Sequence, residues 1–186
     1  MTDYFAVLGQ PRTPWLDPEE LREAFHRKTL KAHPDVATAG EPHDFTALNE
    51  AYQVLQDPKR RLQHLLELEG TTPAAGQPIP PDLEELFLRI GETTQHANTV
   101  VQKMRDTANA LSRSLLKPEV MRAEGEVERL REKVETLLDN ARLQSRELTR
   151  EAAWRSDVAR LSELYLRLSY LGRWKAQLDE LQFQLS

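Results

Sequence analysis

The chain of 186 residues is long enough for one domain or two small ones, and it holds no bilayer-spanning apolar stretch and no secretion signal, so we expect a cytoplasmic protein without membrane contact. The absence of cysteine excludes disulfides, thiolate nucleophiles and every zinc or iron–sulfur site built on cysteine. A formal net charge of −5 argues against general nucleic-acid binding, which usually depends on an excess of basic residues.

The first helical region is predicted between residues 2 and 70. It opens with a short apolar segment at Tyr4–Leu8, which Gly9 stops. A longer helix then starts at Asp17, whose side chain is suited to cap it, with Pro18 in the first turn and Glu20 completing a capping-box pattern. One face of this helix is predicted to be buried, because its apolar residues recur at helical spacing: Leu21, Ala24, Phe25 and Leu30.

This basic helix is expected to end near Ala32, because Pro34 disfavours the helical conformation for the residue before it. A second helix is predicted from about residue 43 to 56. A third covers residues 59–69 and stops at Gly70, since glycine readily adopts the left-handed conformation that closes helices. The apolar stripe of the second helix consists of Phe45, Leu48, Ala51, Tyr52 and Leu55.

Residues 71–81 read TTPAAGQPIPP and have no apolar period, so they are predicted to form a stiff linker. The chain is therefore expected to contain a first domain at residues 1–70 and a second domain at residues 82–186.

Three apolar stripes at helical spacing run through the second domain. The first spans residues 97–115; we expect Gly91 to interrupt the helix before it and Pro118 to break the chain after it. The second repeats every seven residues from 120 to 148, and the third runs from 154 to 185. Three amphipathic helices with short connections favour an all-α antiparallel bundle, and a long coiled-coil dimer is the alternative.

The most informative segment is His33-Pro34-Asp35, although the tripeptide alone is a weak signal. A basic amphipathic helix precedes it, and an apolar-striped helix follows it. With the other matching segments, this order resembles the J-domain family over about the first third of the chain. Those segments are Tyr4-Phe5, Leu8-Gly9, Leu21 with Phe25, Asn49-Glu50-Ala51-Tyr52-Gln53-Val54-Leu55 and Asp57-Pro58.

The resemblance implies a co-chaperone whose loop and preceding helix dock on a DnaK-type ATPase and couple client capture to ATP hydrolysis. Asp35 would make a charge-assisted hydrogen bond to an arginine of the partner, Pro34 would stiffen the loop, and His33 would hydrogen-bond at its neck. Val36 departs from the family, since many members have a basic residue there. The positive helix face that would steer an acidic partner matches Arg22, His26, Arg27 and Lys31.

Each of these residues also has a purely structural interpretation. Pro34 would then be a helix stop, Asp35 a loop cap, and the cationic residues a solvated face.

The second domain lacks the Gly/Phe-rich segment and the cysteine repeats of general DnaJ proteins, and it resembles the HscB family of iron–sulfur cluster co-chaperones. The matching segments are Arg60-Arg61-Leu62 and residues 65–70, 82–86, 168–171 and 178–181. The resemblance implies delivery of an IscU-type scaffold to an HscA-type ATPase. Its apolar client patch falls on Leu83, Leu86, Phe87 and Tyr170, with Leu88 adjacent. The two leucines are equally compatible with the core, whereas the Tyr170 hydroxyl favours a wet edge.

No catalytic residue, metal or cofactor is expected. No two of the five histidines form the i, i+4 metalloprotease pattern with glutamate, and there is no Gly-rich phosphate loop. The predicted partners are a DnaK- or HscA-type ATPase and an IscU-type scaffold, with the chain itself a monomer or weak dimer. Two alternatives stay open: a J-domain protein with a different client, and a coiled-coil structural protein.

Overall fold

The computed structural model describes residues 1–32, 45–71, 78–107, 109–151, 153–155 and 157–186, and this part of the chain is all-α with no strand. Contacts between residues group the chain into two compact units. The first unit holds Met1–Gly76 together with Arg142–Tyr165, and the second holds Gln77–Ala141 together with Leu166–Ser186. The division at residues 70 and 82 stays a prediction.

The first unit begins with α1 (Tyr4–Leu8), whose two ends are set by its own sequence. The Asp3 carboxylate caps the helix by accepting hydrogen bonds from the backbone N–H groups of Phe5 (3.0 Å) and Ala6 (3.3 Å). Gly9 ends the helix with φ 66°, the left-handed conformation that glycine adopts without strain. The predicted stop at Gly9 is confirmed.

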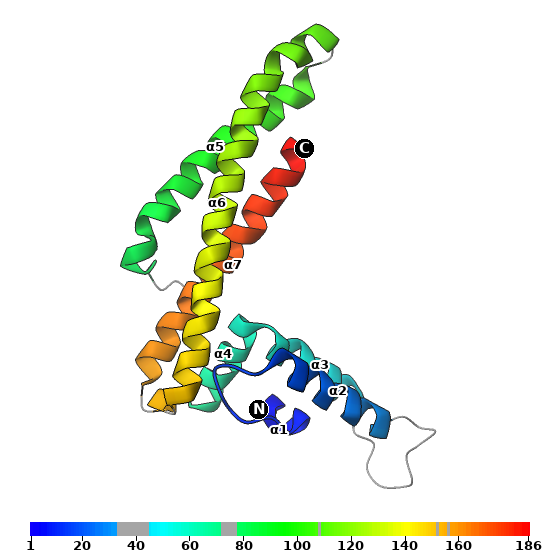
Figure 1. The fold of residues 1–186 in the computed structure, drawn as a ribbon, viewed down its shortest axis with the longest axis vertical. Coiled ribbons are helices and arrows are strands. Elements are labelled where there is room, and N and C mark those ends of the chain that lie inside the picture. The colour runs from blue at the N-terminus through cyan, green and yellow to red at the C-terminus, as the bar shows by residue number, and fades with distance from the viewer. Residues whose placement is uncertain (33–44, 72–77, 108, 152, 156) are drawn as a thin grey trace. The chain divides into compact units, whose positions relative to one another are not determined.

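An antiparallel hairpin of α2 (Pro18–Ala32) and α3 (Phe45–Gln56) forms the body of this unit (Figure 1). Asp17 caps α2 as predicted, because its Oδ1 accepts hydrogen bonds from two first-turn N–H groups at 2.9 and 3.2 Å. Phe25 stacks on Tyr52 across the hairpin, with ring centroids 4.5 Å apart. The fully buried residues of the two helices are Leu21, Ala24, Leu48, Ala51, Val54 and Leu55.

Two residues of the predicted stripes are exposed to solvent. Leu30 is 56% exposed and Phe45 is 54% exposed. Leu30 lies near the end of α2 and Phe45 at the start of α3, so both residues are at the end of the hairpin where few described residues surround them.

The third helix of the hairpin region, α4 (Pro58–Leu68), begins one residue earlier than predicted. Asp57 explains this start, because its Oδ1 accepts a hydrogen bond from the Arg60 N–H at 2.9 Å. Gly70 has φ 76° and closes the helix, as predicted.

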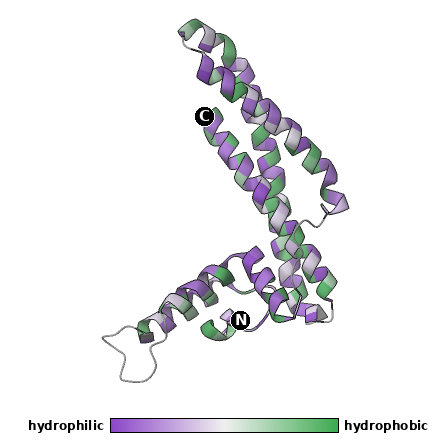
Figure 2. Cartoon of the chain, turned by 180° about the vertical axis from the view of Figure 1, so that it is seen from behind, coloured by the Kyte–Doolittle hydropathy of each residue, from purple (hydrophilic) through white to green (hydrophobic). Residues whose placement is uncertain are grey.

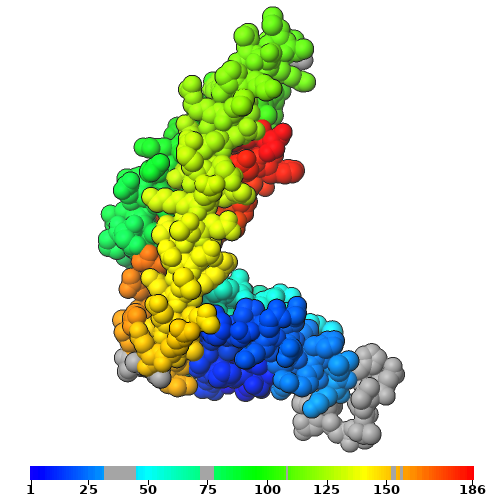
Figure 3. Space-filling view, viewed as in Figure 1, coloured from blue at the N-terminus to red at the C-terminus, as the bar shows by residue number. Residues whose placement is uncertain are grey.

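The end of α6 (Ala110–Glu151), the short helix η2 (Ala153–Arg155) and the start of α7 (Val158–Leu185) complete the first unit. Figure 3 shows this end of α6 lying against the N-terminal residues. Arg160 and Glu151 form an ion pair of 2.9 Å between the two helices. The buried residues here include Leu148, Trp154, Leu161 and Leu164.

The second unit is an antiparallel bundle of three helices (Figure 1): α5 (Glu84–Asp106), which follows η1 (Pro81–Leu83), the first part of α6, and the end of α7. Hydrophobic and hydrophilic residues are interspersed along each helix (Figure 2), and an amphipathic helix places its apolar residues three or four positions apart. Its core contains Leu83, Leu86, Ile90, Ala97, Val100, Val127, Leu130, Val134, Leu171, Leu178 and Leu181.

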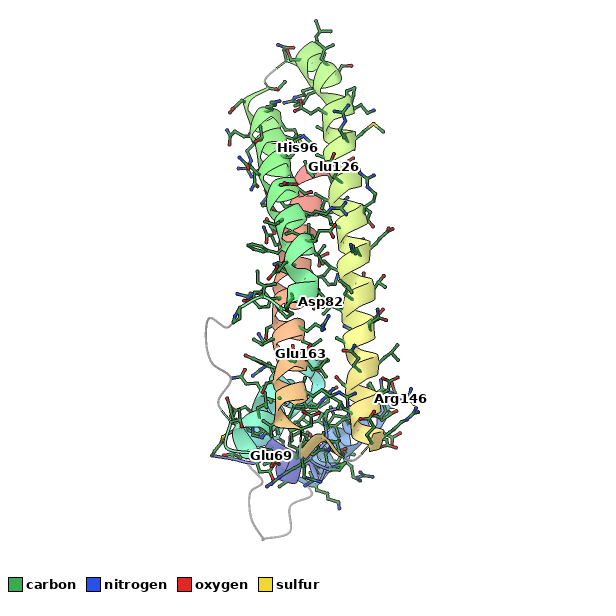
Figure 4. All side chains as sticks on the ribbon, turned by 90° about the vertical axis from the view of Figure 1, so that its left-hand side faces the viewer. Glu69, Asp82, His96, Glu126, Arg146 and Glu163 are labelled. Atoms are coloured by element: carbon green, nitrogen blue, oxygen red, sulfur yellow. The ribbon has the colours of Figure 1, made fainter. Side chains whose placement is uncertain are left out.

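Polar pairs connect the three helices of this unit at their edges. Asp82 accepts two hydrogen bonds from the Arg167 guanidinium at 2.6 and 3.1 Å. His96 Nδ1 lies 2.9 Å from Glu126 Oε2, which joins α5 to α6 (Figure 4).

Gly91 and Pro118 do not interrupt their helices, so both predicted breaks are wrong. A glycine inside a helix costs only about 0.5–1 kcal/mol relative to alanine, which the buried residues around it offset. Pro118 lacks an N–H group, so one helical bond to the carbonyl of Ser114 is missing. Gly91 and Pro118 are both exposed, so neither residue is part of the buried core.

α5 ends at Asp106 and α6 begins at Ala110, so the apolar stripe predicted for one helix belongs to two. Leu111 and Leu115 therefore belong to α6, and they are 73% and 75% exposed rather than buried. Asn109 sets the new start, because its side-chain oxygen accepts a hydrogen bond from the Ser112 N–H at 2.7 Å.

Candidate functional sites

A set of exposed basic residues on α2 forms what we call its cationic face. It consists of Arg22, His26, Arg27 and Lys31, all of which are exposed. Arg22 forms an ion pair with Glu19, one turn earlier. Lys28 does not belong to this face, since its Nζ donates a hydrogen bond to the Val7 carbonyl at 2.7 Å and so points toward α1.

His33, Pro34, Asp35 and Val36 lie outside the described residues, and their exposure and contacts stay predictions. The segment that holds them joins the end of α2 to the start of α3. The cationic face therefore leads directly to it along the chain.

Two buried polar side chains of α4 support this hairpin. Arg61 Nε donates to the Pro14 carbonyl at 2.9 Å, and its Nη1 donates to the Leu55 carbonyl at 2.7 Å. Burial lowers the pKa of Arg61 to about 10, which leaves it protonated at neutral pH. His64 Nε2 accepts a hydrogen bond from the Tyr4 N–H at 3.1 Å, and burial lowers its pKa, so the neutral ring is favoured.

The loop before α2 is attached to the end of α6 through Trp15. The Trp15 N–H donates to Thr149 Oγ1 at 2.9 Å, and the Arg146 guanidinium lies 4.9 Å from the centre of the indole ring (Figure 4). All of these residues belong to the first unit. Neither this attachment nor the role of Arg61 was predicted, because both depend on contacts distant in sequence.

An aromatic patch lies in the second unit, and we define it as Phe87, Leu88 and Tyr170. Phe87 is 45% exposed and Leu88 is 63% exposed, while Tyr170 is half-buried. Phe87 and Tyr170 both contact the buried Trp174, with ring centroids at 6.3 and 5.7 Å. The Arg173 guanidinium covers Tyr170 at 4.7 Å.

The two leucines predicted beside this patch are core residues instead. Leu83 is 1% exposed and Leu86 is 3% exposed, so neither offers a surface to a partner. They pack on the inner side of α5, where burying them stabilises the bundle. Helical periodicity alone did not distinguish the two buried leucines from the exposed Phe87, because all three residues are apolar.

Among the described residues, no three histidines or carboxylates are grouped so as to hold a metal ion. No helix in this same part of the chain is both long and apolar enough to cross a membrane.

The comparison with protein-family models is decisive for the first unit. Residues 3–64 match the DnaJ domain, a range that runs from α1 into α4 and includes His33-Pro34-Asp35. The chain therefore contains a J-domain at these residues. The predicted J-domain at the N-terminus is thereby confirmed.

The curated proteins that are similar to this chain match only part of its sequence. Chaperone protein DnaJ 1 from Cutibacterium acnes is 42% identical over 59 residues, which are 32% of this chain and 14% of that protein. Chaperone protein DnaJ 2 from Thermus thermophilus is 41% identical over 73 residues, which are 39% of this chain and 25% of that protein. The chain thus spans a quarter or less of the length of these two relatives.

Among solved structures, the chaperone HscB from Vibrio cholerae matches over the full length of both chains. The TM-score is 0.57, and the sequences are 22% identical. This likeness shows a shared fold, a J-domain followed by a helical domain. The predicted all-α class and architecture are confirmed.

Proposed function

We propose that this J-domain protein is a co-chaperone that docks on an Hsp70-type ATPase of the DnaK or HscA kind and stimulates its ATP hydrolysis. The observation that carries the proposal is the DnaJ-domain match across residues 3–64. The exposed cationic face supports it, because clustered positive charge accelerates encounter with an acidic surface.

Asp35 is the residue that we place at the partner's surface. A carboxylate that accepts a hydrogen bond from a partner arginine gives a charge-assisted bond, roughly twice as strong as a neutral one. Docking would favour the client-bound conformation of the ATPase, a shift between two populations. This chain would supply no catalytic group of its own.

The test is ATP hydrolysis by the ATPase under single-turnover conditions, with rising amounts of this chain. Asp35→Asn keeps the shape of the side chain and removes its charge, so we expect stimulation to be lost while the helical content stays unchanged. Glu69→Gln, which removes an exposed carboxylate at the end of α4, should stimulate like the wild type. Wild-type stimulation by Asp35→Asn would refute the docking role.

For the client we propose an iron–sulfur scaffold protein of the IscU type, bound at the aromatic patch. The whole-chain likeness to a chaperone named HscB supports this choice. So does the exposure of Phe87 and Leu88, since large apolar side chains on a helical surface are typical of protein interfaces. The direct contacts proposed now are Phe87, Leu88 and Tyr170, without Leu83 and Leu86.

The client is tested by fluorescence anisotropy of a labelled IscU-type scaffold. Phe87→Ala combined with Tyr170→Ala should weaken binding at least about 30-fold, equivalent to roughly 2 kcal/mol for two contact residues. Phe183→Ala is the matched control, because Phe183 is 80% exposed on α7 and lies outside the patch. A scaffold that does not bind the wild type would favour a J-domain protein with a different client.

The oligomeric state and the cytoplasmic location stay predictions. Light scattering that shows a stable dimer, from a chain that stimulates no Hsp70-type ATPase, would favour the structural alternative instead.

A further inference from the structure

A groove of about 450 Å³ lies in the second unit where α5 ends and α6 begins, beside the last turn of α7. Its wall contains flexible apolar side chains. Met104 and Met121 line it, and they are the only methionines of the sequence besides Met1. Leu116 and Val120 also line it, and both are only half-buried. Methionine suits a binding surface because its flexible, polarisable side chain adapts to different partners.

The rim of this groove is cationic. Arg113 and Lys117 line it together with one carboxylate, Glu124. The Arg113 Nε donates a hydrogen bond to the Thr107 carbonyl at 3.2 Å, which holds its guanidinium beside the groove. Lys117 is exposed and forms no ion pair with any described residue. The side chains that line the groove therefore carry two positive charges and one negative charge, and Ser186 at the end of α7 also lines it.

The groove is distinct from the aromatic patch. Met104 and Phe87 are seventeen positions apart on the same helix, α5, which separates them by about 25 Å along its axis. A client bound at Phe87 would leave the groove free for a second contact.

We propose that this groove binds an acidic amphipathic helix of a partner protein. The apolar side chains of such a helix would pack among Met104, Met121 and Leu116, in the manner of a helix lying in a hydrophobic groove. Its carboxylates would pair with Arg113 and Lys117. A second copy of this chain fits less well at the same groove, because two such faces would bring their cationic rims together.

The three methionines provide a direct readout in the full-length chain. We would label their methyl groups with ¹³C and add a synthetic 18-residue peptide that has leucines on one helical face and glutamates on the other. The signals of Met104 and Met121 should shift, whereas that of Met1 should not. The same peptide with lysine in place of each glutamate should leave all three signals unchanged.

Charge-reversal variants test the rim. Lys117→Glu should weaken binding of the acidic peptide at least about tenfold by anisotropy, since attraction becomes repulsion. Arg122→Glu is the matched control, because Arg122 is an exposed cation of α6 that does not line the groove. It should bind like the wild type.

Three results would overturn the proposal: unshifted Met104 and Met121 signals, equal binding of the lysine peptide, or unchanged affinity in Lys117→Glu. It would also fail if phosphatidylserine vesicles shifted the two signals and the acidic peptide did not. The proposal would fail as well if light scattering showed a dimer of the peptide-free chain and Met121→Glu restored the monomer.

Discussion

At the scale of single residues, the buried Arg61 connects separate segments of the first unit. Its guanidinium donates hydrogen bonds to the carbonyls of Pro14 and Leu55, which precede α2 and end α3 respectively. One side chain of α4 thus binds the segment that leads into α2 and the last turn of α3, the two helices that the segment containing Asp35 connects. The proposed docking loop depends on this hairpin for its position.

Removing this cation is expected to destabilise the first unit. Arg61→Met keeps much of the volume but leaves two buried carbonyls without donors. Each unsatisfied carbonyl costs about 1–3 kcal/mol, so the free energy of unfolding should fall by about 2–6 kcal/mol. Urea denaturation followed by circular dichroism measures this. Arg60→Met alters the exposed neighbour and should cost under about 0.5 kcal/mol. Equal stability of the two variants would contradict the role of Arg61.

Residue-level prediction succeeded where the physics is local. The capping roles of Asp17 and the stops at Gly9 and Gly70 follow from side chains within a few positions, so the sequence alone predicts them. Leu86 and Phe87 are adjacent apolar residues, yet one is buried and the other exposed. Which of the two side chains is buried depends on where α7 packs, and no local sequence pattern specifies that.

At the scale of elements, α6 shows how tertiary packing overrides helix-breaking residues. Its residues Ala123, Val127, Leu130 and Val134 are buried on one side, and this burial stabilises a helix that contains Pro118. The sequence predicted three helices correctly but placed the first turn too late. Asn109 caps the start of α6, whereas the apolar spacing that continues through Leu115 predicted one helix across this position.

Replacing the internal proline should therefore stabilise the bundle. Pro118→Ala restores a helical N–H donor on an exposed position, so we expect the free energy of unfolding to rise by about 1–3 kcal/mol in thermal or urea denaturation. Pro58→Ala is the contrast, because Pro58 occupies the first turn of α4, where proline is favoured. It should give no gain. A loss of stability in Pro118→Ala would mean that the proline shapes α6.

At the scale of the whole molecule, one chain carries two proposed surfaces in two compact units. The cationic face and the segment containing Asp35 belong to the first unit, and the aromatic patch belongs to the second. From its J-domain pattern and its helical stripes, the sequence predicts domains at residues 1–70 and 82–186, and this division stays a prediction. It did not predict that residues 142–165 pack with the J-domain, because long-range contacts such as Trp15 to Thr149 have no local signature.

We propose that this chain couples a client to an ATPase because both surfaces are on the same molecule. Two variants each disable one of the two surfaces. Asp35→Asn lacks the proposed docking carboxylate, and the combined Phe87→Ala and Tyr170→Ala variant lacks the proposed client contact. Each variant alone should fail to produce the client-dependent rise in ATP hydrolysis.

The most direct test mixes these two variants in equal amounts with the ATPase and the scaffold client, and measures the ATP hydrolysis rate. We predict that the mixture stays at the rate of the patch variant alone, because no single molecule holds both partners. A mixture that restores the full wild-type rate would contradict the account, since the two surfaces would then act without being joined.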